Sequence, residues 1–213
     1  MTPKNLTWAI QRLQEDEKAF GQVIQEPVIP GHLLHCFACD WAVRVLQMHR
    51  NSLGEPAAVL WKAVQMKRAW LEGRLSPKEL PVLWMNLVEL AWEIRCEEAS
   101  EVAMITAWSV LWDEDTEASA RLSALRVCEM STRFVIRRVI DTRFSHIPGE
   151  HPGWNQVWTR VRKAEEALQC QYLLSMLQTY QETQGQLLHT LTQRAEKPKW
   201  EQWFSLFEES LFE

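Results

Sequence analysis

Apolar residues recur at steps of three and four positions along almost the whole chain. This spacing collects them on one face of an α-helix, and no segment shows the sustained apolar and polar alternation that a half-buried strand requires. The pattern therefore predicts an all-α fold, an antiparallel array of about seven to nine helices in a single domain.

Prolines, glycines and capping residues divide this pattern into helices. We expect a first helix over residues 6–20, followed by an irregular arm in which Pro27, Pro30 and Gly31 prevent helix continuation. Residues 76–79, with the sequence SPKE, form a capping box and predict a helix start. The other expected helices cover residues 33–49, 56–73, 117–143, 154–183, 187–194 and a last segment from 198.

The same pattern suggests how the chain is organised. The helix after Ser76 either continues or breaks near Ala99 and Ser100, with a helical segment over 102–112 beyond that point. We expect three parts: an N-terminal helix and arm at 1–31, a helical core domain at 32–183, and C-terminal amphipathic aromatic helices at 184–213 that pack on the core or on a partner.

Glycine is scarce, with 7 residues among 213, whereas its average share in proteins is about 7%. These glycines form neither G-x-G-x-x-G nor a phosphate-binding loop, and the chain also lacks the H-E-x-x-H, G-x-S-x-G and Glu-x-x-His motifs. We therefore predict that the protein is not an enzyme and uses no cofactor.

The charge balance restricts the classes of partner. The chain has 23 Lys and Arg residues against 28 Asp and Glu residues, a net charge of −5. Proteins that bind DNA or RNA usually carry a basic excess, so we expect no nucleic-acid partner. The longest stretch without a charged residue, 167–181, is too short and too polar to cross a bilayer, so we also expect no membrane segment.

The cysteines and the N-terminal sequence bear on the compartment. Five cysteines, an odd number spread along the chain, do not form a disulfide framework, and we interpret them as reduced thiols. The first twenty residues lack the apolar stretch of a signal peptide. Both observations predict a cytoplasmic protein.

One cluster has residue types that could bind zinc, namely His32, His35, Cys36 and Cys39. On a helix, steps of four residues would place one histidine beside one cysteine twice. However, structural zinc sites usually collect ligands from two separate segments. We favour the interpretation that the cysteines are buried core residues and the histidines flank the helix start, and a zinc site is the alternative.

Acidic residues repeat every four positions in the middle of the chain, at Glu89, Glu93, Glu97 and Glu101. Like charges at this spacing destabilise a helix, so we expect a compensating partner for this acidic ladder. One alternative lies within the chain, where a later helix carries Arg126, Arg133 and Arg137 on one face. The other alternative is a basic protein that docks on the ladder.

The chain contains 12 tryptophans, which separate into two groups. Six occur at helical spacing among Leu, Val and Ala, which predicts a core position for most of them: Trp61, Trp70, Trp84, Trp92, Trp108 and Trp112. Trp200 and Trp203 instead belong to a short, strongly aromatic C-terminal segment. We expect this segment to dock on its own chain, to form a homodimer or to bind a partner.

Three segments carry a resemblance to a known family. CFACDWAVRVLQMHRN contains an Arg-Val-Leu sequence, AVLWKAVQMKRAWLEGRLSPKEL contains Arg-Ala-Trp-Leu-Glu-Gly, and AEEALQCQYLLSML at 164–177 has an acidic pair and Gln before a leucine-rich stretch. Over residues 36–178 the chain resembles an alanine-rich helical family of immunity proteins from bacterial polymorphic-toxin systems. It departs from that family by carrying Trp, Met and Leu where the family has runs of Ala. The resemblance implies a toxin-neutralising protein, with no catalytic residues to carry over.

These observations lead to one functional hypothesis and two alternatives. The hypothesis is a non-enzymatic module that binds a cognate toxin domain and occludes its active surface. The first alternative is a helical protein that binds a small molecule or metal near His32 to Trp41, and the second is an oligomer-forming structural subunit. The partner-binding residues that we predict are Glu89, Glu93, Glu97, Glu101, Trp200 and Trp203.

Overall fold

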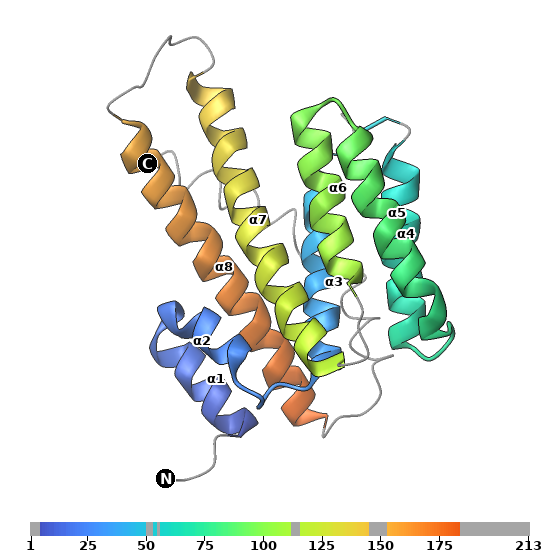
Figure 1. The fold of residues 1–213 in the computed structure, drawn as a ribbon. Helices are drawn as coiled ribbons and strands as arrows, with labels where there is room; N and C mark the ends of the chain where they lie inside the picture. Colours follow the sequence, from blue (N-terminus) through green and yellow to red (C-terminus); the bar gives the residue numbers. More distant parts are fainter. Residues whose placement is uncertain (1–4, 50–52, 55, 112–115, 145–152, 184–213) are drawn as a thin grey trace.

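The computed structural model describes residues 5–49, 53–54, 56–111, 116–144 and 153–183 (Figure 1). These residues form eight α-helices and two short 3-10 turns without any strand, which confirms the all-α prediction. The elements in chain order are α1 (Leu6–Glu15), η1 (Glu17–Ala19), α2 (Phe20–Gln25), α3 (Gly31–Met48), α4 (Pro56–Leu71), η2 (Pro77–Glu79), α5 (Leu80–Glu93), α6 (Glu97–Val110), α7 (Thr116–Phe144) and α8 (Trp154–Glu182).

Most helices pack against the helix that follows them in the chain. The pairs α5 with α6, α6 with α7, and α7 with α8 are in contact, and α1 packs on α8 at one edge of the array. The opposite edge is formed by α4 and α5 (Figure 1). Because α5 contacts mainly α6, one of its faces has no helix packed on it among the described residues.

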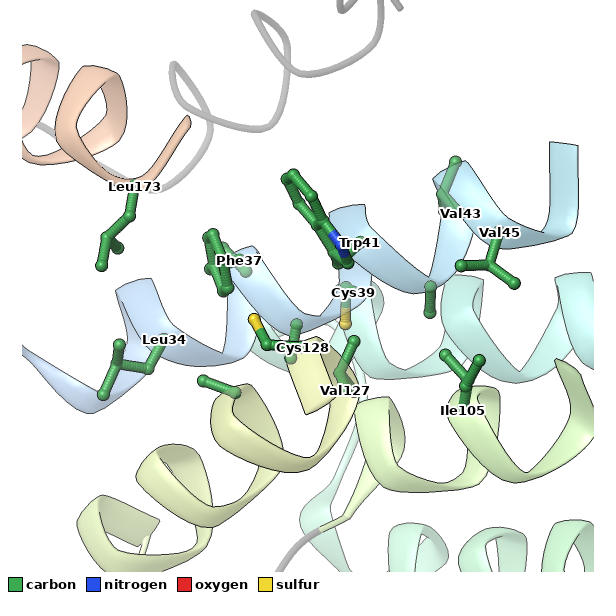
Figure 2. Close-up of a cluster of buried hydrophobic side chains, with 14 of the residues drawn as sticks. Leu34, Phe37, Cys39, Trp41, Val43, Val45, Ile105, Val127, Cys128 and Leu173 are labelled. Carbon is green, nitrogen blue, oxygen red and sulfur yellow. The ribbon is translucent and has the colours of Figure 1, made fainter. Parts of the chain in front are cut away.

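The centre of the array is α3, which packs against α4, α6 and α7. Nearly all of its residues are buried, and a helix that is apolar on every side belongs inside a protein. Phe37 and Trp41 stack with ring centroids 5.5 Å apart, and Figure 2 shows Ile105 of α6 and Val127 of α7 beside the same helix. Even so, no helix in the described residues has both the length and the apolar character needed to span a membrane.

The single helix that we expected over residues 6–20 is a wrong prediction, because α1 ends at Glu15 and α2 begins at Phe20. Asp16 causes the interruption. Its backbone is extended, and its side-chain Oδ1 accepts a hydrogen bond at 3.0 Å from the backbone N–H of Lys18. Aspartate favours such local bonds over the helical ladder, and here it starts the 3-10 turn.

The helix break that we placed near Ala99 and Ser100 also lies elsewhere. α5 ends at Glu93, the chain turns at 94–96, and α6 starts at Glu97. The Ser100 hydroxyl donates a hydrogen bond at 2.6 Å to the carbonyl of Ala91, one of the last carbonyls of α5, which lack a partner within the helix. Ser100 therefore lies inside α6, and its hydrogen bond connects α6 to the C-terminal end of α5 across the turn at 94–96.

The N-terminus of α3 is capped by a residue from a distant part of the chain. The backbone N–H of Gly31 donates a hydrogen bond at 3.0 Å to Oε1 of Glu117, which belongs to α7. A Cβ atom at position 31 would lie 2.9 Å from that oxygen. A negative charge is favourable at a helix N-terminus, so glycine here permits a stabilising contact between α3 and α7.

We predict opposite effects for two glycine substitutions. Gly21→Ala, in α2, places a methyl group where nothing lies within 4 Å, and should stabilise the protein by about 0.5–1 kcal/mol through helix propensity. Gly31→Ala should instead destabilise it by about 1 kcal/mol, because the Glu117 carboxylate must move away. Urea unfolding of both variants tests this, and equal stabilisation by both substitutions would contradict the role of Glu117.

Candidate functional site

The outer face of α5 exposes large apolar side chains. Leu87 and Ala91 are buried within the core, whereas Val82, Met85 and Trp92 are 62%, 48% and 80% exposed. Steps of three, four and three residues connect positions 82, 85, 89 and 92, which places them on one helical face. We name Val82, Met85, Glu89, Trp92 and Glu93 the α5 surface.

Trp92 was expected in the core, and its 80% exposure shows that this prediction is wrong. Trp92 follows the buried Ala91, and one residue along a helix rotates the side chain by about 100°. That rotation turns the indole away from the core. The prediction is confirmed for Trp61, Trp84 and Trp108, which are partly buried and pack against the core, whereas Trp112 lies outside the described residues.

The four glutamates of the acidic ladder do not form one continuous stripe, because the chain leaves the helical path between α5 and α6. Glu89 and Glu93 are exposed, and no described residue forms an ion pair with either of them. They are therefore the part of the ladder that is available to a partner.

The other half of the ladder forms ion pairs within the chain. Arg137 of α7 forms ion pairs with Glu97 and, at 3.0 Å, with Oε1 of Glu101. Burial raises the pKa of Glu101, as do the neighbouring carboxylates Glu97, Glu98 and Asp141, while Arg137 lowers it. These two glutamates hold α6 against α7.

Only one of the three predicted arginines faces the ladder. Arg126 and Arg133 both pair with Glu129 on their own helix, at 3.0 and 2.6 Å, and of the three only Arg137 forms an ion pair with a glutamate of α6. Pairing with arginine within the chain thus accounts for Glu97 and Glu101. Docking of a basic protein stays a prediction for Glu89 and Glu93.

The residues of the proposed zinc site turn toward different neighbours. The rings of His32 and Tyr180 are 5.6 Å apart, and His35 contacts Trp70 edge-on at 5.4 Å. The Cys39 thiol points to the carbonyl of Ser109 at 3.8 Å. Within the described ranges, no group of three or more His, Cys, Asp or Glu side chains is arranged to hold a metal ion.

The two cysteines of this cluster are buried, as we expected. Burial raises the pKa of Cys39 to about 12, with a further increase from Asp40 that Arg68 and Lys67 oppose. Burial also raises the pKa of Cys36 well above its usual value. The thiolate is the form that attacks electrophiles and binds metals, so these thiols are suited to packing rather than to chemistry.

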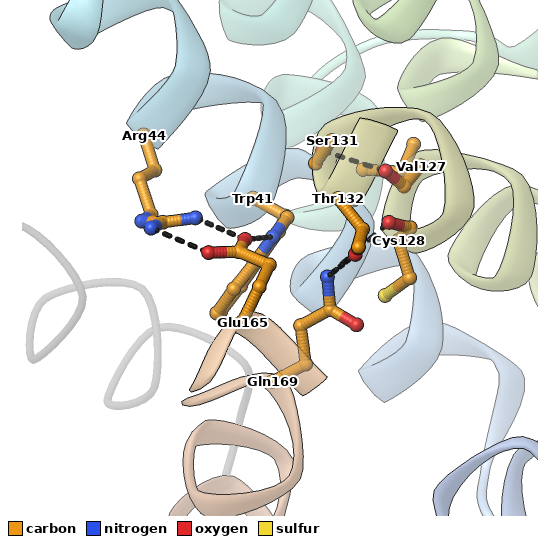
Figure 3. Close-up of polar contacts among 8 residues, drawn as sticks. All are labelled: Trp41, Arg44, Val127, Cys128, Ser131, Thr132, Glu165 and Gln169. Carbon is orange, nitrogen blue, oxygen red and sulfur yellow. Dashed lines mark hydrogen bonds and ion pairs between the residues drawn. The ribbon is translucent and has the colours of Figure 1, made fainter. Parts of the chain in front are cut away.

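A buried ion pair that the sequence analysis did not find connects α3 with α8. Arg44 forms two hydrogen bonds with the carboxylate of Glu165, and the Trp41 indole N–H donates a third at 3.3 Å (Figure 3). Arg44 is 3% exposed and Glu165 is 0% exposed. Along α8, Gln169 donates to the Cys128 carbonyl at 3.2 Å, which adds α7 to the same polar layer.

A second buried polar group connects α3, α4 and α8. Asp40 accepts hydrogen bonds from Arg68 of α4 and, at 2.6 Å, from the Tyr172 hydroxyl of α8. Burial raises the pKa of Asp40, and Arg68 and Tyr172 oppose this by favouring the carboxylate. The signal for both networks was present in the sequence, because Asp40 and Arg44 are the only Asp, Glu, Lys or Arg residues in the largely apolar α3.

Lys67 is fully buried, and burial lowers its pKa to about 7. Its ammonium group donates a hydrogen bond at 2.8 Å to the carbonyl of Leu111, the C-cap residue of α6, and lies 4.2 Å from the centroid of the Trp70 ring. A low pKa is typical of reactive lysines, but this amine is hydrogen-bonded at the C-terminal end of α6, where the helix dipole is negative. Its role is therefore to cap α6.

The C-terminal pair Trp200 and Trp203 lies outside the described residues. Their predicted role in docking or dimerisation stays a prediction. The candidate site that the structure does describe is the α5 surface, which combines apolar side chains with two exposed carboxylates.

We predict that Arg44→Met destabilises the protein by about 3–5 kcal/mol, because it leaves the Glu165 carboxylate buried without a cation. The double variant with Glu165→Met should recover most of this loss, since an apolar pair of similar volume needs no counter-charge. Urea unfolding of the single and double variants measures both values. A double variant as unstable as Arg44→Met would show that packing, not charge pairing, explains the loss.

The low pKa of Lys67 predicts a specific pH dependence. The amine has a pKa of about 7 in the folded protein and an ordinary value of 10.5 in the unfolded chain, so between these values the unfolded chain binds more protons and stability increases with pH. From about pH 7 to about pH 8.5, the wild type should gain about 1–2 kcal/mol relative to Lys67→Met. Denaturant unfolding at both pH values tests this, and parallel pH profiles would contradict it.

The chain was compared with models of protein families, with curated proteins and with solved structures. No model of a protein family matches the chain, and neither a curated protein nor a solved structure matches it.

Proposed function

We propose that this protein is a non-enzymatic binding module that attaches to a cognate toxin domain and neutralises it by covering its active surface. The observation that carries the proposal is the exposure of Trp92, Met85 and Val82 on one face of α5. Large apolar side chains exposed together on one face favour association, and tryptophan is among the residues that contribute most to binding energy.

The way α5 is held also supports binding. Leu87 and Ala91 anchor the helix in the core, and the hydrogen bond from Ser100 to Ala91 fixes its C-terminal end beside α6. A surface on a fixed helix loses little conformational entropy when a partner binds. The α5 surface is thus preorganised for binding.

Occlusion agrees with the chemistry of the buried groups. Cys36, Cys39, Cys128 and Lys67 have nucleophilic side chains in or beside α3, and all four are buried. An inhibitor that acts by covering a surface needs shape and charge rather than a reactive group. The resemblance to immunity proteins over residues 36–178 includes all of α5 and supports the same function.

The alternatives have less support. Metal binding at His32 to Cys39 lacks a suitable group of ligands among the described residues. An oligomer-forming subunit would depend on the segment that contains Trp200 and Trp203, which the structure does not describe. Binding through the α5 surface requires neither a metal site nor the segment that contains Trp200 and Trp203.

We predict that Trp92→Ala abolishes neutralisation while the fold is kept. Its side chain is 80% exposed, so its loss should change the free energy of unfolding by less than about 0.5 kcal/mol, whereas the affinity for the toxin should fall at least about thirtyfold. The measurement is growth of bacteria that co-express the protein with toxin genes adjacent to its own gene, together with the Kd of the purified complex.

Trp158→Ala is the matched control, because Trp158 is also exposed, at 41%, but belongs to α8. This variant should protect as well as the wild type does. Failure of the wild-type protein to neutralise or bind any of these toxins would refute the proposed function.

A further inference from the structure

The α5 surface has a charge pattern that indicates which class of partner it fits. Glu89 and Glu93 lie on the same helical face as the apolar side chains, and α5 itself contains no Lys or Arg. The nearest cation in the chain, Arg95, follows the end of the helix. The apolar residues are therefore accompanied by two negative charges that are not neutralised by an ion pair among the described residues.

A second copy of the chain fits this surface poorly. In a symmetric dimer through α5, the same patch meets itself, which brings Glu89 and Glu93 of both copies into one interface. Like charges placed together in an interface are strongly unfavourable. The surface is therefore better suited to a different protein than to self-association.

The C-terminal segment of this chain is an equally poor occupant. Residues 198–213 contain the four acidic residues Glu201, Glu208, Glu209 and Glu213 against a single cation, Lys199. The segment could supply aromatic side chains, but it would add negative charge beside Glu89 and Glu93. Nucleic acids and anionic lipids are unfavourable for the same electrostatic reason.

We propose that the α5 surface binds a basic, amphipathic segment of a protein partner. Apolar residues of that segment cover Val82, Met85 and Trp92, and its Arg or Lys side chains pair with Glu89 and Glu93. Arginine fits especially well, since it forms bidentate hydrogen bonds with carboxylates and stacks on indole rings. This inference deepens the proposed function, on which it rests, by naming the chemistry of the toxin surface.

The test uses the full chain and two synthetic peptides of about 18 residues, or five helical turns. One peptide is an amphipathic helix of Leu and Lys, and the other has Glu in place of each Lys. We expect the Leu and Lys peptide to bind the wild type and the Leu and Glu peptide to bind at least about tenfold more weakly. Equal binding of both peptides would overturn the proposal.

Charge-neutral variants locate the site. Glu89→Gln with Glu93→Gln should weaken binding of the Leu and Lys peptide about tenfold and reduce its salt dependence. The control, Glu15→Gln with Glu182→Gln, removes the same number of exposed charges from α1 and α8, at the opposite edge of the array, and should change the affinity by less than about twofold (Figure 1). Equal weakening by both double variants would show that only net charge matters and would overturn the proposal.

Three further outcomes distinguish this inference from the proposed function and from self-association. A toxin that is neutralised equally well by the wild type and by the Glu89→Gln, Glu93→Gln variant would refute the basic partner and leave the binding function intact. Sedimentation that shows a dimer of the wild type, lost in Trp92→Ala, would assign the α5 surface to a second copy and overturn the proposal. Absence of any neutralised toxin, with the peptide results as expected, would refute the toxin assignment alone.

Discussion

The burial of α3 on all sides is the constraint on which the rest of the structure depends. A helix with neighbours all around it cannot send its charged side chains to water, so each must find a partner inside the protein. Arg44 pairs with Glu165, and Asp40 accepts hydrogen bonds from Arg68 and Tyr172. These contacts connect α3 to α8 and α4. These contacts restrict how the surrounding helices can be arranged, because a shift of either neighbour would leave a buried charge unpaired.

The position of α5 follows from this arrangement. Helices α4, α6 and α7 cover α3, and α5 packs on α6 at the edge of the array. Its outer face therefore has no neighbour within the described part of the protein, although it carries Val82, Met85 and Trp92. This exposed apolar face is the feature on which the proposed binding function rests.

Sequence reasoning succeeded where a structure depends on nearby residues. Helical periodicity located most of the helices, and the buried cysteines of α3 were expected from their place among apolar residues. It failed where the outcome depends on what packs against a residue. Trp92 has the spacing of a core residue, but no helix of the described residues covers it. Glu97 and Glu101 pair with Arg137, whereas Glu89 and Glu93 do not. Spacing along the chain reports the face of a helix and not the presence of a second helix over that face.

The sequence by itself determined that this protein is helical and roughly where its helices begin and end, because helix formation and capping involve residues within about four positions of one another. Only the tertiary structure decided which charges are buried or paired and which are exposed. Arg44 and Glu165 are separated by 121 positions, and Gly31 and Glu117 by 86. Contacts over such separations depend on how the helices pack, and in the described part of the chain the same packing leaves the α5 surface uncovered.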